Sequence, residues 1–232
     1  MSILYIVATP IGNLEDITER ALRVLSEVDL ILCEDTRKTK ILLDRFQIKT
    51  PTQSYHQHSK IDKINYIADL LRRQKNIALV SDAGTPGISD PGNKLIEQLL
   101  GLAIEELKII PVPGASAVLA ALSVSGFPTD RFLFLGFVPL KNKRKKFFEE
   151  IVVSKYTVIF YESPYRIIKA LDELDSLYTK YLILNTKIVV GRELTKKFET
   201  IYRGEIKDVI MKIRKDEQKG EFVVIINNKK RE

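Results

Sequence analysis

Acidic side chains that directly follow apolar runs are the first candidates for chemistry in this sequence. Glu34 and Asp35 follow the run at 30–33, and Glu162 follows the run at 157–161. An apolar run that ends in polar residues is typical of a buried strand that opens into a loop. A carboxylate or imidazole in such a loop can act as a general base toward a substrate hydroxyl. The candidate proton acceptors are Glu34, Asp35, His56 and Glu162.

A glycine- and proline-rich segment at 81–92 is the best candidate for a ligand-binding loop. It holds three glycines, two prolines and two carboxylates, and it follows the apolar run at 77–80. In open α/β sheets, ligands bind at the loops that follow the carboxyl ends of strands, and glycines let the backbone approach a ligand closely. Asp82 is placed to accept hydrogen bonds from a hydroxyl or an amine. The alternative is a surface loop that needs several turns.

Several common classes of site lack their sequence signatures. The segment at 8–18 has one glycine, unlike the dinucleotide motif G-x-G-x-x-G, and neither a G-x-x-x-x-G-K-[ST] phosphate loop nor a G-x-S-x-G nucleophile elbow occurs. His56 and His58 could share one face of a strand, but no H-x-x-x-H pair accompanies them, so we expect no metal site. Cys33 is the single cysteine and therefore excludes an internal disulfide.

Strands and helices alternate in the first half of the predicted fold. Strands are predicted at 4–8, 30–33, 77–81 and 109–112, and helices at 17–26, 36–46, 60–73 and 93–100. Asp16 is a candidate N-cap of the first helix, with Glu19 as its capping-box partner. Asp35 or Thr36 could cap the second helix. This alternation predicts βαβ units and a mainly parallel sheet.

The pattern changes near residue 113, where prolines bracket a short segment and a new helical pattern begins at Ser116. Further strands are predicted at 132–137, 157–161, 188–191, 200–203 and 222–226. Their close spacing predicts a mixed sheet in a second domain. We therefore expect two α/β domains, at 1–113 and 114–232, with a cleft between them that could bind a small molecule.

The charge of the chain favours an acidic partner. The formal net charge is +7, and residues 141–146 include four lysines and one arginine. Dense positive charge can bind several phosphates of a nucleic acid, although a solvated helix start is an equally good interpretation. No apolar stretch approaches the roughly 18 residues that span a bilayer, and the first residues lack the basic region of a signal peptide. We expect a cytoplasmic protein that does not contact a membrane.

Six motifs together resemble a known family. They are residues 8–14 (ATPIGNL), 34–37 (EDTR), 81–92 (SDAGTPGISDPG), 113–117 (PGASA), 160–166 (FYESPYR) and 191–196 (GRELTK). In this order they resemble the tetrapyrrole methylase-like methyltransferases, and within that group the ribosomal RNA small subunit methyltransferase I family. Each motif alone is weak, but the set covers nearly the whole chain.

The resemblance implies a dimeric methyltransferase that binds S-adenosylmethionine in the cleft between its two domains. It also implies 2′-O-methylation of a cytidine ribose in the decoding region of small-subunit (16S) ribosomal RNA, either free or in the assembled subunit. The implied cofactor-binding residues are Ile11, Asp82, Thr85, Ser116, Ala117, Tyr161 and the backbone near Leu194. The implied RNA-binding residues are Arg37, Lys141, Lys143, Arg144, Lys145 and Lys146.

Two other functions are compatible with the same motifs. The fold could methylate a tetrapyrrole or another small molecule, because fold does not fix substrate. A non-catalytic RNA-binding module is the second alternative, but such a module would not need a cofactor loop. The basic segment favours RNA over a small molecule.

Overall fold

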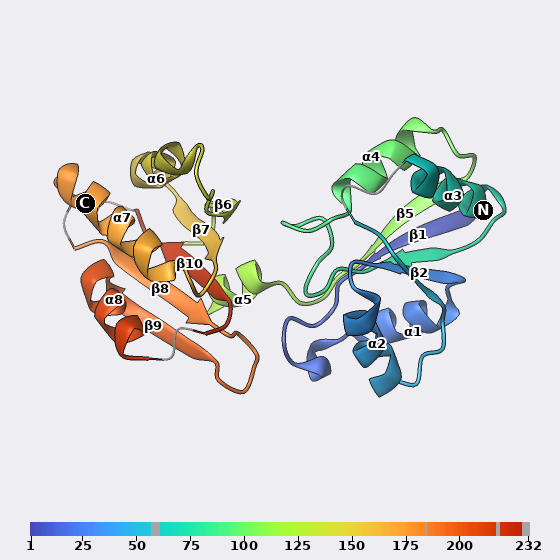
Figure 1. Ribbon diagram of the computed structural model, residues 1–232, viewed down its shortest axis with the longest axis horizontal. Coiled ribbons are helices and arrows are strands. Elements are labelled where there is room, and N and C mark those ends of the chain that lie inside the picture. Colours follow the sequence, from blue (N-terminus) through green and yellow to red (C-terminus); the bar gives the residue numbers. More distant parts are fainter. Residues whose placement is uncertain (57–60, 184, 217–218, 229–232) are drawn as a thin grey trace. The chain divides into compact units, whose positions relative to one another are not determined.

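The computed structural model of the chain describes residues 1–56, 61–183, 185–216 and 219–228. It forms two compact units, Met1–Ser116 and Ala117–Glu232 (Figure 1). No helix within the described ranges is long and apolar enough to cross a membrane.

The first unit is built on a five-stranded parallel sheet. Its strands are β1 (Ser2–Val7), β2 (Leu30–Cys33), β3 (Thr52–Ser54), β4 (Ile77–Leu79) and β5 (Leu107–Val112). They lie in the order β3-β2-β4-β1-β5, and every pairing is parallel. The central strands β2 and β4 are buried along their whole length, as expected where helices cover both faces of a parallel sheet.

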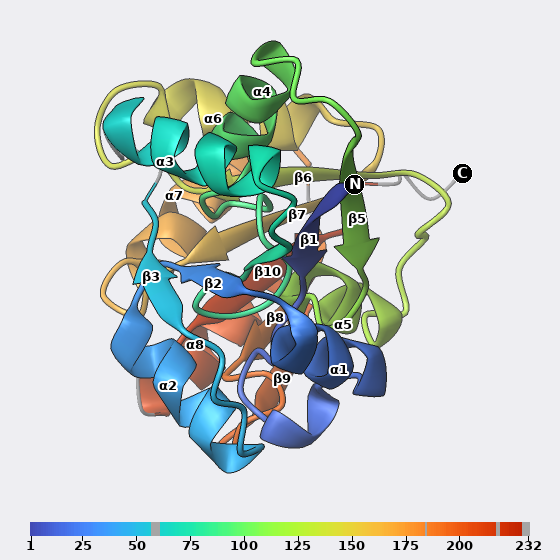
Figure 2. The same cartoon turned by 90° about the vertical axis from the view of Figure 1, so that its right-hand side faces the viewer.

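Helices cover the two faces of this sheet (Figure 2). They are α1 (Glu19–Glu27), α2 (Thr36–Arg45), α3 (Ile61–Arg72) and α4 (Asn93–Gly101), with a short 3₁₀ helix at Leu14–Asp16. Side chains alternate along β1, so Leu4 packs in the core beneath α3 and α4, whereas Val7 packs in the core beneath α1 and α2. Because the strands all run in the same direction, their carboxyl ends lie at one edge of the sheet.

Two details of the first unit differ from the sequence prediction. Thr18 caps α1, since its hydroxyl accepts a hydrogen bond from the Ala21 N–H at 3.1 Å, and Asp16 belongs to the 3₁₀ helix instead. An N-cap side chain reaches only the second or third N–H of its helix, and Asp16 lies too far upstream. Strand β3 was not predicted, because its Thr-Gln-Ser sequence has no apolar residue; it is held by pairing with β2.

The second unit contains a mixed five-stranded sheet. Its strands are β6 (Phe132–Phe137), β7 (Thr157–Glu162), β8 (Lys187–Arg192), β9 (Thr200–Glu205) and β10 (Phe222–Ile226), in the order β6-β7-β10-β8-β9. Strands β6 and β7 are parallel, and the other three pairings are antiparallel. The expected fold class, a mainly parallel first sheet and a mixed second sheet, is confirmed.

One face of the second sheet carries three helices. These are α6 (Arg144–Val153), α7 (Ile167–Lys180) and α8 (Ile206–Lys215). Phe148, Leu171 and Ile210 from the three helices pack with Phe160 and Val224 of the sheet in one core. The remaining helix, α5 (Ala117–Ser123), begins the unit directly after its boundary with the first.

Candidate active site

The turn after β2 and the loop after β4 are joined through Asp82. Its Oδ1 accepts a hydrogen bond from the backbone N–H of Asp35 at 3.1 Å, and its Oδ2 lies 2.7 Å from the Lys38 ammonium. Because β2 and β4 are adjacent parallel strands, their following residues lie at the same edge of the sheet. This edge therefore places Glu34, Asp35 and Asp82 in one acidic group, partly neutralised by Lys38.

The side chain of Asp35 is occupied by Arg37. It caps α2 by accepting from the Arg37 backbone N–H at 2.9 Å, and it binds the Arg37 guanidinium at 3.0 Å (Nε) and 2.7 Å (Nη2). These hydrogen bonds, first from the side chain and then from the backbone of Arg37, hold the pKa of Asp35 far below its usual range. Asp35 is therefore a weak proton acceptor, whereas Arg37, with 88 % of its side chain exposed, faces solvent in a fixed orientation.

The pKa of the Glu34 carboxyl is shifted in the opposite direction from that of Asp35. Burial raises the pKa of its carboxyl, and the negative charge of Asp82 raises it further. Its Oε1 is buried and accepts no hydrogen bond from any described residue. A half-buried carboxyl with an unpaired oxygen and a raised pKa has two properties of a general base. His56 is exposed beyond the end of β3, and His58 lies outside the described residues.

Glycines bring the 8–14 and 81–92 segments into contact. Thr9 and Gly84 exchange two backbone hydrogen bonds, of 2.9 and 3.0 Å. Gly84 has a φ of +80°, and a Cβ at this position would lie 3.3 Å from Cγ2 of Ile11. The left-handed conformation and the close approach both explain the glycine.

A third segment joins the same edge. The Thr85 hydroxyl donates to the Ala115 carbonyl at 3.2 Å, and Gly114 packs so closely on Ala8 that a Cβ would lie 3.0 Å from the Ala8 Cβ. Ile11, Thr85 and Ser116 thus come from three loops that are tied together in the first unit. Ser116 and Ala117, the last and first residues of the two units, are half-buried.

In the second unit, Tyr161 and Glu162 end strand β7 in different environments. The half-buried Tyr161 ring packs on Phe134 and Phe137, with centroids 5.0 and 5.2 Å away. The Glu162 side chain is fully buried, and its Oε1 accepts from the Ser163 N–H and lies 2.7 Å from Arg166, both within its own loop. This arrangement indicates that Glu162 fixes the loop after β7.

In the basic segment at 141–146, Arg144 is mostly buried, whereas the four lysines are exposed. Lys141, Lys143, Lys145 and Lys146 are exposed at the start of α6. Arg144 has only 13 % of its side chain exposed, lies 2.8 Å from Glu173 and 3.9 Å from Glu162, and donates to the Pro139 carbonyl. Helical spacing explains this, because Arg144 shares the inward face with Phe147, Phe148 and Ile151.

The loop after β8 is held by residues that the sequence interpretation did not connect. The Lys196 ammonium lies 2.9 Å from Glu193 and 3.1 Å from Glu221, on the loop before β10. Leu194 is buried against Gly191, where a Cβ would approach its Cδ2 to 2.9 Å. Residues close to Glu221 in the sequence carry no signal of an ion pair with a distant segment. The contact of Glu221 with Lys196 could therefore not be predicted from the sequence.

Comparison with known proteins places this geometry in a family. A family model described as "Tetrapyrrole (Corrin/Porphyrin) Methylases" matches residues 3–210. The chain belongs to the tetrapyrrole methylase family. Within this family, it belongs to the ribosomal RNA small subunit methyltransferase I group, because relatives of that name match it over nearly its whole length.

Three such relatives of this tetrapyrrole methylase come from different bacteria. The protein from Vibrio cholerae is 48 % identical over 97 % of this chain and 77 % of the relative, and that from Synechocystis is 45 % identical over 97 % and 79 %. The protein from Thermotoga maritima is 40 % identical over 99 % of this chain and its own full length. All three are named ribosomal RNA small subunit methyltransferase I.

Two solved structures share the fold of this chain at low sequence identity. A cobalt precorrin-4 methyltransferase superposes with a TM-score of 0.71 at 18 % identity, covering 97 % of this chain and 94 % of its own. A diphthine synthase superposes with a TM-score of 0.72 at 11 % identity, covering 97 % and 90 %.

In the described part of this chain, no three His, Cys, Asp or Glu side chains gather as a metal site would require.

Proposed function

We propose that this tetrapyrrole methylase transfers a methyl group from S-adenosylmethionine to the 2′-hydroxyl of a cytidine in the decoding region of small-subunit ribosomal RNA. The observation that carries the proposal is the 40–48 % identity to relatives named ribosomal RNA small subunit methyltransferase I. The exposed lysines at the start of α6 support an RNA substrate. Such a substrate would place the protein in the cytoplasm.

The residues at the carboxyl edge of the first sheet fit the cofactor. S-adenosylmethionine carries hydroxyls, an amine and a positively charged sulfur, and Asp82 offers a carboxylate at the strand end where such groups are bound. Its carboxylate has about four acceptor sites, of which the hydrogen bonds within the protein use two. Ile11, Thr85 and Ser116 of the first unit, and Ala117, Tyr161 and the Leu194 backbone of the second, are the other proposed contacts.

Glu34 is the proposed proton acceptor. S-adenosylmethionine supplies a methyl group on a sulfonium, so its leaving group needs little assistance. The ribose hydroxyl is a poor nucleophile, and Glu34 would take its proton as the new oxygen–carbon bond forms and the bond between the methyl carbon and the sulfur breaks. General-base assistance of this kind contributes about 10²–10⁴-fold, while alignment of the hydroxyl can contribute about 7–11 kcal/mol.

The other acidic candidates take supporting roles in this proposal. Asp35 orients Arg37 toward the RNA backbone, and Glu162 fixes the loop that carries Tyr161. Arg144 positions this loop from within, whereas Lys141, Lys143, Lys145 and Lys146 contact phosphates.

A homodimer is also part of the proposal, supported by the exposed apolar side chains Phe132 and Phe137 on the edge strand β6.

The test is transfer of labelled methyl groups from S-adenosylmethionine to small ribosomal subunits that lack their native modifications. The product nucleotide is mapped, and naked small-subunit RNA is assayed in parallel. Methylation of one cytidine ribose is the expected result. Cofactor binding by calorimetry without transfer to either RNA would reject the proposal and point to a small-molecule acceptor.

A further inference from the structure

A groove between α6 and α7 in the second unit includes Lys145, a proposed phosphate contact, but most of its lining residues have no role in the proposed methyl transfer. It has a volume of about 840 Å³. Ile168 and Leu177 contribute its apolar surface above the buried Phe148, and Lys145, Lys169 and Tyr165 contribute cations and an aromatic ring. Apolar surface beside cations is the composition that single-stranded nucleic acids require for stacking and for phosphate contacts.

Tyr165 is the most unusual residue of this groove. It lies in the loop between β7 and α7 and is 95 % exposed. A tyrosine ring that packs on so little of its own protein leaves nearly its whole apolar face free to stack on a partner. A nucleobase offers a flat face of matching size and chemistry.

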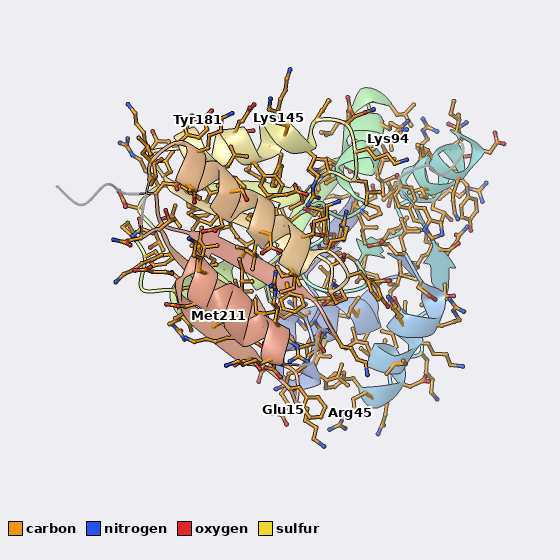
Figure 3. The ribbon with its side chains drawn as sticks, turned by 60° about the vertical axis from the view of Figure 1, so that its left-hand side comes forward. Glu15, Arg45, Lys94, Lys145, Tyr181 and Met211 are labelled. Atoms are coloured by element: carbon orange, nitrogen blue, oxygen red, sulfur yellow. The ribbon has the colours of Figure 1, made fainter. Side chains whose placement is uncertain are left out.

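The charge of the groove favours an anionic partner. Its two acidic residues are already paired, Asp172 with Arg214 at 2.8 Å and Glu173 with Arg144 at 2.8 Å. Lys169 is exposed and makes no ion pair with any described residue. Lys145 is 82 % exposed and extends outward from α6 (Figure 3), with Glu149 3.7 Å away as its only ion-pair partner among the described residues. Lys169 is therefore available to phosphates, and Lys145 can exchange its long, exposed pair with Glu149 for a phosphate contact.

We infer that this groove binds a single-stranded segment of the RNA substrate, with one base stacked on Tyr165 and the adjacent phosphates held by Lys145 and Lys169. The inference rests on the proposed function for the identity of the RNA. It adds Tyr165 and Lys169 to the RNA contacts, and it assigns stacking, rather than charge alone, to this surface.

The experiment measures the affinity of the full-length protein for a single-stranded oligonucleotide with the decoding-region sequence, by fluorescence anisotropy at several salt concentrations. Tyr165→Ala is expected to weaken binding about tenfold or more, the usual effect of removing a stacking aromatic. Tyr165→Phe keeps the ring and is expected to bind like the wild type. Lys169→Ala is expected to weaken binding. It should also reduce the steepness of the plot of log affinity against log salt concentration by about 0.7, the contribution of one phosphate contact in a single strand.

Matched controls come from the far end of the same helix. Tyr181 and Lys180 lie at the C-terminal end of α7, and both are exposed. The 14 residues of this helix separate them from Tyr165 by about 20 Å at 1.5 Å per residue. Tyr181→Ala and Lys180→Ala are expected to leave RNA affinity unchanged, and the affinity for S-adenosylmethionine is expected to be the same in all variants.

The outcomes separate this inference from the proposed function. If the wild type methylates the RNA and Tyr165→Ala binds it as tightly as Tyr181→Ala does, the groove inference is overturned and the proposed function stands. Impaired methylation of assembled subunits with unchanged affinity for the oligonucleotide also overturns it and indicates a ribosomal protein as the partner. Loss of binding in Tyr165→Ala, in a protein that transfers no methyl group to RNA, supports the groove and rejects the proposed reaction.

Discussion

The carboxylate of Asp82 accepts a hydrogen bond from the backbone N–H of Asp35, 47 positions earlier in the chain, at 3.1 Å. This contact connects the loop after β4 to the turn after β2. It also holds the negative charge of Asp82 near Glu34, where that charge adds to the effect of burial on the Glu34 pKa. One residue therefore serves both the proposed cofactor loop and the proposed base.

Replacing the proposed base should separate chemistry from binding. Glu34→Gln keeps the size of the side chain and removes its ability to accept a proton. We expect the single-turnover rate of methyl transfer to fall by about 10²–10⁴-fold, with unchanged affinity for S-adenosylmethionine. Rapid-quench assays and calorimetry measure the two quantities. A rate like that of the wild type would show that positioning alone drives the reaction.

The same variant should be more stable than the wild type at neutral pH. A carboxyl whose pKa is raised by folding binds its proton more tightly in the native state, so it lowers stability as the pH rises from the unfolded pKa to the folded one. Glu34→Gln has no such loss. Thermal melting of both proteins across pH 4 to 8 should show their difference growing with pH; a constant difference would contradict the raised pKa.

The acid limb of the pH–rate profile should depend on Asp82. The rate is expected to rise with pH as Glu34 loses its proton. Asp82→Asn removes a like charge, so the pKa of Glu34 falls and the limb moves to lower pH. Single-turnover rates with saturating cofactor measure this shift independently of weaker cofactor binding. Movement of the limb to higher pH would exclude Glu34 as the group that titrates.

Gly84 should tolerate no side chain. Its φ of +80° and the 3.3 Å approach to Ile11 predict that Gly84→Ala is destabilising, by about 1–2 kcal/mol for the conformation alone. Gly101→Ala is the matched control, because this glycine ends α4 with open space around it; there, alanine should be neutral or stabilising. Urea unfolding compares the two, and equal effects would argue against the close packing of the loops.

Glu162 should prove structural. Its side chain is buried beside Arg166 and Arg144, and removing one partner from a buried ion pair typically costs about 3–5 kcal/mol. We expect Glu162→Gln to lose stability on this scale in urea unfolding, while Glu149→Gln, which affects an exposed pair, changes it by less than about 1 kcal/mol. A stable Glu162→Gln variant without activity would instead assign Glu162 a role in catalysis.

Sequence patterns were sufficient where a local rule determines the structure. The apolar run of β2 was predicted with the observed bounds, and Asp35 was one of the two predicted candidates for the cap of α2. The inward orientation of Arg144 was missed, although its spacing from Phe147 and Phe148 indicates it. The Asp82–Asp35 contact and the pairing of Lys196 with Glu221 join distant segments, and no local rule predicts them.

The position of β1 in its sheet has a consequence for how the protein is made. This strand lies between β4 and β5, so it has no neighbour until residues 77–112 have been synthesised. At about 5–20 residues per second, translation leaves β1 without β4 for roughly 4–14 s and without β5 for roughly 5–21 s. During this interval the nascent chain exposes an apolar strand on the ribosome, and we expect chaperones that bind extended apolar segments to engage it there.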